Sequence, residues 1–445
     1  MMQNPELRRN LWLEITPHRL VGAPLAIALL LALIANQAGA DWRGAVSAAA
    51  VVVYVAVTIL WGGRKTYESI VDEVRERTWD TQRMSALSPW EMTVGKLLGS
   101  TAFNWYVGAF CLLVLLYCHD PAQARYMELW PAPQLSILLV TTTLFLHGAG
   151  LLSGLTSVRA GRTVKPVRNL PLTVLALAIL LMVGRLLFQR VESSIVWYDA
   201  AWSSWPFTLA SLLTFTAWVW LGAWRLMSDL LAVRSIPWAA LAFVIFLTAY
   251  LCGFVPDDSW SYASRYAAIG ALVGGTAVYI EAWKERRDWI VVKRFLHAWR
   301  DESLQRALEA TPDWLVVAVF TLLVSLATSL LPANHPIVPA MASNWMNVLT
   351  VSPMVMTLLM FRDIGLLYFF SLGSRPDRAT TATLGYLAVL YVILPGLLNV
   401  VGLAFLALPI YAPVEHGGWP WFGIIVAAGH VAVVVALLRQ RLMTV

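Results

Sequence analysis

Long uninterrupted apolar runs recur from one end of the 445-residue chain to the other, and they limit what the chain can fold into. Each run has about 20 residues, the length that an α-helix needs to cross the hydrocarbon core of a bilayer. The runs are continuously apolar rather than alternating, which favours helices over membrane strands. Only 13% of the residues are charged, whereas about a quarter are charged in a typical soluble protein. The sequence therefore predicts an all-α polytopic membrane protein and excludes soluble enzymes, disulfide scaffolds and disordered chains.

Ionisable residues concentrate between the apolar runs, so each run can be delimited to within a few residues. A run that is long enough to span and carries almost no charge predicts one transmembrane helix. We therefore predict about twelve transmembrane helices, at residues 20–35, 44–62, 97–118, 134–157, 170–187, 205–227, 237–255, 262–283, 314–331, 345–360, 383–407 and 420–438.

The distribution of Lys and Arg predicts the orientation of these helices. Cytoplasmic segments of membrane proteins are enriched in Lys and Arg. With the N-terminus inside, nearly all of the 32 basic residues fall on the cytoplasmic side, and both termini are cytoplasmic. Because the basic residues are spread over short segments with no single stripe, the net charge of +6 does not indicate a nucleic-acid partner. The basic residues predicted outside are Arg43, Arg125, Arg185, Arg190 and Arg265.

Two of the predicted cytoplasmic loops, residues 63–96 and 284–313, are much longer than the others. Each follows the second helix of a set of six. Gln-Arg and Ser/Thr-Pro pairs recur in both, at a constant offset close to half the chain length. Transporters often contain internal repeats, so we predict two parallel six-helix halves, residues 20–228 and 229–445. The recurring residues are Gln82, Arg83, Ser88 and Pro89 in the first loop, and Gln305, Arg306, Thr311 and Pro312 in the second.

Residues 1–19 precede the first apolar run and predict a helix that lies in the membrane interface. Asn4 is a good N-cap, and Pro5 suits the first helical position. Apolar residues recur every four positions with Trp12 beside them, which gives the helix one apolar face. An amphipathic helix of this kind lies in the plane of the interface. The recurring apolar residues are Leu7, Leu11 and Ile15.

The first long loop carries the most specific pattern in the chain. A Glu-Arg-Thr sequence is followed by a mixed amphipathic stretch, a Ser-Pro pair and a Gly-Lys pair that opens the next span. The residues are Glu76-Arg77-Thr78, Ser88-Pro89 and Gly95-Lys96. Over roughly residues 4–100 this pattern resembles the ABC-2 type permeases, the membrane subunits of ATP-driven exporters. In that family an elbow helix precedes the first span, and a coupling helix after the second span docks into a groove of the ATPase subunit. The second loop matches less well, because its Gly-Lys pair is absent.

The resemblance implies that the chain is a transmembrane permease subunit in the cytoplasmic (inner) membrane and no enzyme. The chain has no Gly-x-x-x-x-Gly-Lys-[Ser/Thr] phosphate-binding motif. ATP and Mg²⁺ would therefore bind to separate cytoplasmic ATPase subunits, one beneath each half. The sequence leaves open whether further membrane or periplasmic subunits belong to the complex. We expect no cofactor, metal site or catalytic residue on this chain. The residues assigned to ATPase coupling are Glu76, Arg77, Thr78, Trp79, Asp80, Gln82, Arg83, Ser88, Pro89, Gly95, Lys96, Gln305, Arg306 and Pro312.

Polar residues inside membrane spans usually mark a transport pathway. In the resembled family the second and fifth helices of each half line the route, which makes Tyr54, Thr58 and Asn399 candidates here. The lining would be mainly apolar and would suit an amphipathic or lipid-like substrate. We place Asp363 and Glu281 at cytoplasmic helix ends, so the predicted spans contain no carboxylate at mid-depth. That absence argues against coupling to protons or sodium.

Two other functions fit parts of the sequence. A secondary transporter of the major-facilitator type would also have twelve helices in two parallel halves, but that family has a short loop after the second span. A membrane-embedded transferase acting on lipid-linked sugars would need an acidic pair on an external loop, and Asp257-Asp258 is the only adjacent acidic pair in the predicted external loops.

Overall fold

The computed structural model shows a helical protein with one short hairpin among the residues that it describes. Within the part of the chain that the structure describes, six helices are long and apolar enough to cross a membrane, or seven if one bent pair of helices is a single span. These helices support the predicted all-α membrane protein. The predicted span 170–187 lies outside the described residues, which are 4–85, 87–119, 131–159, 194–233, 237–255, 262–285, 287, 289–330, 353–373, 378–403 and 420–444.

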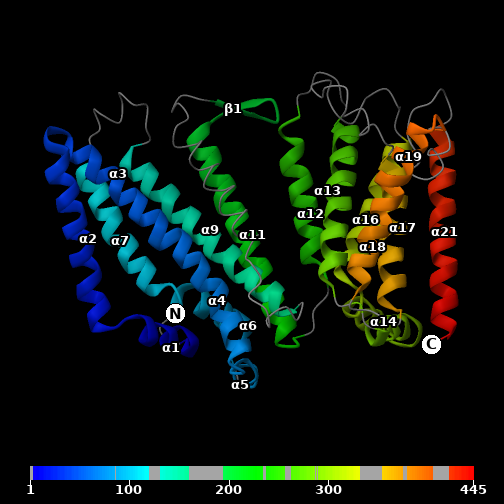
Figure 1. Ribbon diagram of the computed structural model, residues 1–445, viewed down its shortest axis with the longest axis horizontal. Coiled ribbons are helices and arrows are strands. Elements are labelled where there is room, and N and C mark those ends of the chain that lie inside the picture. The colour runs from blue at the N-terminus through cyan, green and yellow to red at the C-terminus, as the bar shows by residue number, and fades with distance from the viewer. Residues whose placement is uncertain are drawn as a thin grey trace. The chain divides into compact units, whose positions relative to one another are not determined.

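The chain divides into two compact units. The first comprises Met1–Val196 and Ala200–Arg234, and the second comprises Trp197–Asp199 and Ser235–Val445. The elements of the first unit, shown in blue to green in Figure 1, are α1 (Pro5–Glu14), α2 (Pro17–Ala38), η1 (Gly39–Asp41), α3 (Trp42–Tyr54), η2 (Val55–Trp61), α4 (Gly62–Arg75), α5 (Trp79–Arg83), α6 (Pro89–Val94), η3 (Gly95–Gly99), α7 (Ala102–Cys118), α9 (Ala132–Arg159), β1 (Ser194–Trp197), β2 (Ala200–Ser203) and α11 (Ser204–Leu230).

The second unit is also helical. The side chains of the Trp197–Asp199 turn contact α12, where Trp197 Nε1 donates to the carbonyl of Tyr250. The other elements of this unit are α12 (Ala239–Cys252), α13 (Tyr262–Lys284), α14 (Trp289–Asp301), α15 (Leu304–Glu309), α16 (Asp313–Leu330), α17 (Pro353–Ser371), α18 (Ala379–Ala388), η6 (Val389–Ile393), α19 (Leu394–Val400) and α21 (Pro420–Thr444).

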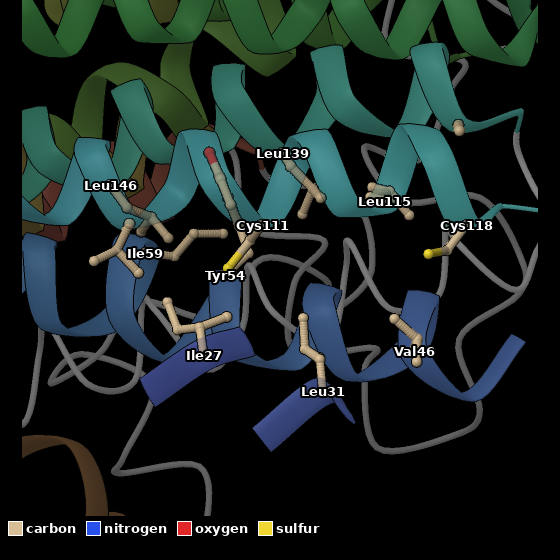
Figure 2. Packing of buried hydrophobic residues seen from close by; sticks show 12 residues of the cluster. Ile27, Leu31, Val46, Tyr54, Ile59, Cys111, Leu115, Cys118, Leu139 and Leu146 are labelled. Atoms are coloured by element: carbon tan, nitrogen blue, oxygen red, sulfur yellow. The ribbon is translucent and has the colours of Figure 1, made fainter. Parts of the chain in front are cut away.

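Each unit has its own apolar core. In the first unit, side chains from α2, α3, α7 and α9 interlock around the buried ring of Tyr54, and Figure 2 shows Cys111 and Leu139 beside it. In the second unit, α12, α13, α16 and α17 pack around buried residues such as Val278 and Met360. Many side chains on the outer faces of these helices are apolar and exposed. Exposed apolar helix faces are suited to contact with lipid.

One predicted boundary is wrong, because residues 63–75 are helical rather than part of a loop. The helix that begins with α3 continues without a break through the π-helical segment η2 and on through α4 to Arg75. It continues because α4 buries one face against α9. A Cβ atom added at Gly150 would lie 2.3 Å from the Gly63 carbonyl, and one at Gly154 would lie 2.8 Å from the Tyr67 carbonyl. These two glycines let the backbones of α4 and α9 touch.

Candidate functional site

The segment after α4 forms a tight reversal at the end of the first unit (Figure 1). Arg77 lies in the left-handed region with φ of 61°. The Arg77 N–H donates to the Val74 carbonyl at 3.2 Å, and the Thr78 N–H donates to the Glu73 carbonyl at 2.9 Å. These two bonds form a Schellman motif, which normally has glycine at the left-handed position. A non-glycine residue there is strained, and such strain is often found at functional sites.

Five of the predicted coupling residues lie on the surface of this reversal. Glu76, Arg77 and Thr78 are exposed on the turn, and Asp80 and Arg83 are exposed on α5. They present both signs of charge within a few residues. Met84, which follows α5, has 81% of its surface exposed and adds an apolar contact.

Trp79 has a different environment from its neighbours. It is buried beneath α5 in a cluster with Tyr67, Ile70 and Met92. Its indole therefore anchors the reversal to α4 and α6 and is not available to a soluble partner. Leu87 packs against the same cluster.

Ser88 and Glu91 form a capping box at the start of α6. The Glu91 N–H donates to Ser88 Oγ at 3.2 Å, and the Ser88 N–H donates to Glu91 Oε2 at 2.9 Å. Pro89 occupies the first helical position. The capping box starts α6 directly after the exposed reversal.

Replacing Ser88 by alanine should destabilise the start of α6 by about 1 kcal/mol, because the cap supplies the acceptor for an otherwise unpaired N–H. Amide hydrogen exchange over residues 88–92 should accelerate several-fold. Ser85 offers a matched control, since its hydroxyl donates to the Gln82 carbonyl and caps no helix start. Equal exchange rates in Ser88→Ala and the natural protein would contradict this role.

Lys96 lies at the centre of a buried ionic cluster behind the reversal. Its side chain is 1% exposed and contacts two carboxylates, Glu6 Oε1 at 3.1 Å and Glu73 Oε2. The side-chain oxygen of Gln82 accepts a further bond from Nζ at 3.2 Å, and the amide of Gln82 donates to Glu73 Oε1 at 2.6 Å. Arg9 bonds Glu73 at 2.6 Å and Glu6 at 3.0 Å. Two cations therefore balance two carboxylates, and we call these five residues the Lys96 cluster.

The Lys96 cluster joins four elements, and α1 is far from the other three in the sequence. Glu6 and Arg9 come from α1, Glu73 from α4, Gln82 from α5 and Lys96 from η3. A buried charge network is rigid because its members cannot separate without losing compensation. The predicted coupling residues Gln82 and Lys96 thus hold the reversal in place from within, rather than facing a partner.

Helix α1 reaches the cluster because η3 has glycines four residues apart. A Cβ at Gly95 would lie 2.7 Å from Glu6 Cβ, and one at Gly99 would lie 2.7 Å from Asn10 Cβ. Asn10 Nδ2 also donates to Glu6 Oε1 at 3.1 Å. The polar face of α1 is therefore the buried one. Trp12 is 80% exposed and Leu13 is 53% exposed, as suits the predicted interfacial helix, whereas Leu7 and Leu11 are half-buried.

Replacing Gly99 by valine is expected to push α1 away from η3, because the new side chain would overlap Asn10. Overpacking of this kind costs about 1–3 kcal/mol. With one cysteine introduced on α1 and one on η3, a disulfide should form between them more slowly in the chain that also carries Gly99→Val than in the chain that does not. The equivalent change at Gly22, where a Cβ meets nothing within 4 Å, is the control and should have no effect. Unchanged cross-linking in Gly99→Val would contradict the proposed contact.

The second long loop has a different structure. It contains α14 and α15, and Gln305 and Arg306 lie exposed on α15, where Gln305 bonds Glu309 at 3.1 Å. Pro312 lies directly before α16. In the repeat alignment, Val319 takes the place of Lys96, so the second loop has no corresponding lysine.

The three predicted pathway residues do not all belong to one unit. Tyr54 is 1% exposed, and its hydroxyl pairs with Thr143 Oγ1 at 2.9 Å. Thr58 is fully buried and donates to the Asn104 carbonyl at 3.2 Å. Both side chains therefore belong to the packed core of the first unit. Asn399 is exposed on α19 in the second unit.

The predicted absence of a carboxylate within the spans is wrong. Arg362 and Asp363 lie at the middle of α17, which is long and apolar enough to span a membrane, and they are 3% and 1% exposed. The predicted span 345–360 ended just before this pair, which placed both residues in a cytoplasmic loop. The helix instead runs over 353–371, because an apolar stretch continues on the far side of the pair.

No family model, no curated protein and no solved structure matches the chain. Among the described residues, no group of three or more His, Cys, Asp or Glu side chains could hold a metal ion.

Proposed function

We propose that the chain is the membrane subunit of an ATP-driven exporter of the ABC-2 type. One observation carries this proposal: a charged, exposed reversal at residues 76–84 is fixed by a buried ionic cluster to the interfacial helix α1 and to α4 and η3. A segment that transmits force needs an accessible surface and a rigid base. Residues 76–84 have both, and their sequence is where the chain resembles that family.

In this proposal, soluble ATPase subunits dock on the cytoplasmic side of the inner membrane. Exposed charges of both signs on the reversal, such as Asp80 and Arg83, would meet complementary charges on the ATPase. Hydrolysis of ATP on those subunits would displace the reversal, and the rigid Lys96 cluster would pass the displacement to α1 and α4. The substrate would be amphipathic or lipid-like, because the described spans are mainly apolar.

The test is ATPase activity that copurifies with the full chain from its natural membranes. Arg77→Gly is the sharpest variant, because glycine relieves the strain at positive φ and should stabilise the fold by about 0.5–1 kcal/mol. We expect Arg77→Gly and Arg83→Glu each to reduce the copurifying activity at least several-fold while the chain stays folded. Arg64→Glu is the control, since Arg64 is 69% exposed on α4 outside the reversal. Full transport without any ATPase subunit, or unaltered activity in both variants, would refute the proposal.

A secondary transporter is the second candidate, and the buried Arg362–Asp363 pair favours it. Ionisable residues at membrane depth often belong to ion-coupled pathways. Uptake driven by a proton gradient in vesicles without ATP would favour this candidate over the exporter.

A further inference from the structure

A group of polar side chains converges around the middle of α17 in the second unit. Asp363 Oδ2 accepts hydrogen bonds from the hydroxyls of Tyr279 at 2.7 Å and Tyr391 at 2.9 Å. Asp363 Oδ1 accepts from Arg362, whose Nε is 2.8 Å away and whose Nη2 is 2.7 Å away. Arg362 Nη1 lies 3.2 Å from His430 Nδ1. We call these five residues the Asp363 cluster.

The Asp363 cluster draws its members from four elements. Tyr279 comes from α13, Tyr391 from the π-helical segment η6 and His430 from α21, while the ion pair belongs to α17. A π-helical turn is uncommon and often occurs at functional sites. An ion pair in this position needs an explanation, because replacing it with packed apolar side chains would often be neutral or stabilising.

The chemistry around Asp363 selects the ligand that it could bind. Both carboxylate oxygens face hydrogen-bond donors, namely two hydroxyls and a guanidinium. A metal cation would need several oxygen atoms with free lone pairs, and the charge of Arg362 would repel it. A proton needs one oxygen only and adds no coordination shell. The phenolic oxygens of Tyr279 and Tyr391 can also accept a bond from a protonated carboxyl group.

Arg362 has a second set of partners that do not depend on the charge of Asp363. Its guanidinium lies 4.9 Å from the centre of the Tyr391 ring, a cation–π distance, and donates to His430. These partners lie on η6 and α21, whereas Asp363 lies on the same helix as Arg362. Arg362 cannot lose its charge, so a neutral Asp363 would leave its guanidinium dependent on Tyr391 and His430.

We propose that the Asp363 cluster is a proton-binding site within the membrane-spanning part of the second unit. A proton taken from water adds to the carboxylate of Asp363 and forms an O–H bond to one of its oxygens. The guanidinium of Arg362 then shifts from Asp363 toward His430 and the Tyr391 ring, which changes how α17 is held against η6 and α21. This inference does not depend on the ATP-driven function proposed above.

The groups that face the site from each packed helix define its pH response. Tyr279 faces Asp363 from α13, Tyr391 faces it from η6, and His430 faces Arg362 from α21. On the α16 side, α17 makes polar contacts through the Ser325–Thr357 hydroxyl pair and through the Tyr368 hydroxyl, which accepts from Trp314 Nε1. His430 Nδ1 must carry no proton in order to accept a hydrogen bond from Arg362. In this arrangement the group of the cluster that binds a proton is therefore the Asp363 carboxylate and not the imidazole.

The experiment is infrared difference spectroscopy of the full chain in lipid nanodiscs, recorded between alkaline and acidic pH. The natural protein should gain the carbonyl band of a buried protonated carboxyl group, and Asp363→Asn should lack that band. Asp229→Asn is the control, because Asp229 forms an ion pair with Arg159 in the first unit and should leave the band intact.

Two further variants keep both charges and therefore remain informative if Asp363→Asn fails to fold. Tyr391→Phe removes a donor to the carboxylate and should move the pH midpoint of the band upward by about one unit. His430→Ala removes the alternative partner of Arg362 and should move the midpoint downward by about half a unit. Tyr386→Phe on α18 is the control for the tyrosine change and should leave the midpoint in place. A missing carboxyl band in the natural protein, or a midpoint that neither variant moves, would overturn the proposal.

Discussion

Replacing Lys96 by methionine is expected to lower the free energy of unfolding by about 3–5 kcal/mol, the range found when one member of a buried ion pair is removed. Methionine fills a similar volume but leaves Glu6 and Glu73 with Arg9 as the remaining cation of the Lys96 cluster. Arg9 alone cannot compensate both carboxylates, since it is the more exposed of the two cations, with 41% of its side chain accessible. Unfolding of the purified chain in mixed detergent micelles measures this loss.

Two companion variants show whether the loss comes from unpaired charge. The triple variant Glu6→Gln, Glu73→Gln, Lys96→Met removes Lys96 and both carboxylates together, leaves only the 41% exposed Arg9 charged, and should recover most of the lost stability. Lys65→Met is the matched single change, because Lys65 also pairs with a glutamate, Glu14, but is 30% exposed. It should cost no more than about 1 kcal/mol, as for other accessible ion pairs. Equal losses for Lys65→Met and Lys96→Met would refute the buried-charge explanation.

The second large effect is expected at the ion pair of α17. Asp363→Asn should destabilise the second unit by about 3–5 kcal/mol, because it leaves the Arg362 guanidinium buried without its counter-ion. Arg362→Gln should cost less, since Asp363 can become neutral by binding a proton, whereas an arginine cannot release one. Thermal unfolding of the two variants in detergent, compared at neutral pH, measures the difference.

The double variant Arg362→Gln, Asp363→Asn tests the same account from the opposite direction. It removes both charges and retains amide groups that can bond the tyrosine hydroxyls, so its stability should exceed that of Asp363→Asn alone. Asp229→Asn in the first unit should have a small effect, because its ion pair with Arg159 is about one-third exposed. A double variant less stable than Asp363→Asn would contradict this explanation.

The membrane-helix class and several local features were predictable because they depend on short stretches of sequence. Apolar runs of sufficient length predict spans wherever they lie. The N-cap at Asn4 follows from residues only a few positions apart, and the structure confirms it. The capping box of Ser88 and Glu91 likewise depends on residues three positions apart. The continuation of α4 to Arg75 was missed because its apolar residues lie on one face only, and charged residues occupy the other.

The Lys96 cluster could not be predicted from local pattern, because Glu6 and Lys96 are 90 positions apart. One signal was present in the sequence: Gly95 and Gly99 are four residues apart, a spacing that lets two helices approach closely. The polar residues of α1, Glu6 and Asn10, lie opposite its apolar face, but their burial depends on the position of η3.

The Asp363 cluster was missed for a different reason. A hydropathy pattern treats adjacent charged residues as the end of a span, and Arg362-Asp363 therefore closed the predicted helix too early. The apolar residues that follow, from Ile364 to Phe370, were the signal that the helix continues. The tyrosines that bond Asp363 lie 84 and 28 positions away, so only the tertiary structure shows that the carboxylate has partners.

The direct backbone contact of α4 with α9 at Gly150 and Gly154 restricts how the first unit can deform. Rotating α4 about its own axis would drive the side chains of Thr66 and Ile70 into a backbone that has no room for them. The two helices are therefore expected to tilt or slide together as one rigid body. A force applied at Arg77 would then move α4 and α9 together and would not rotate α4 about its own axis.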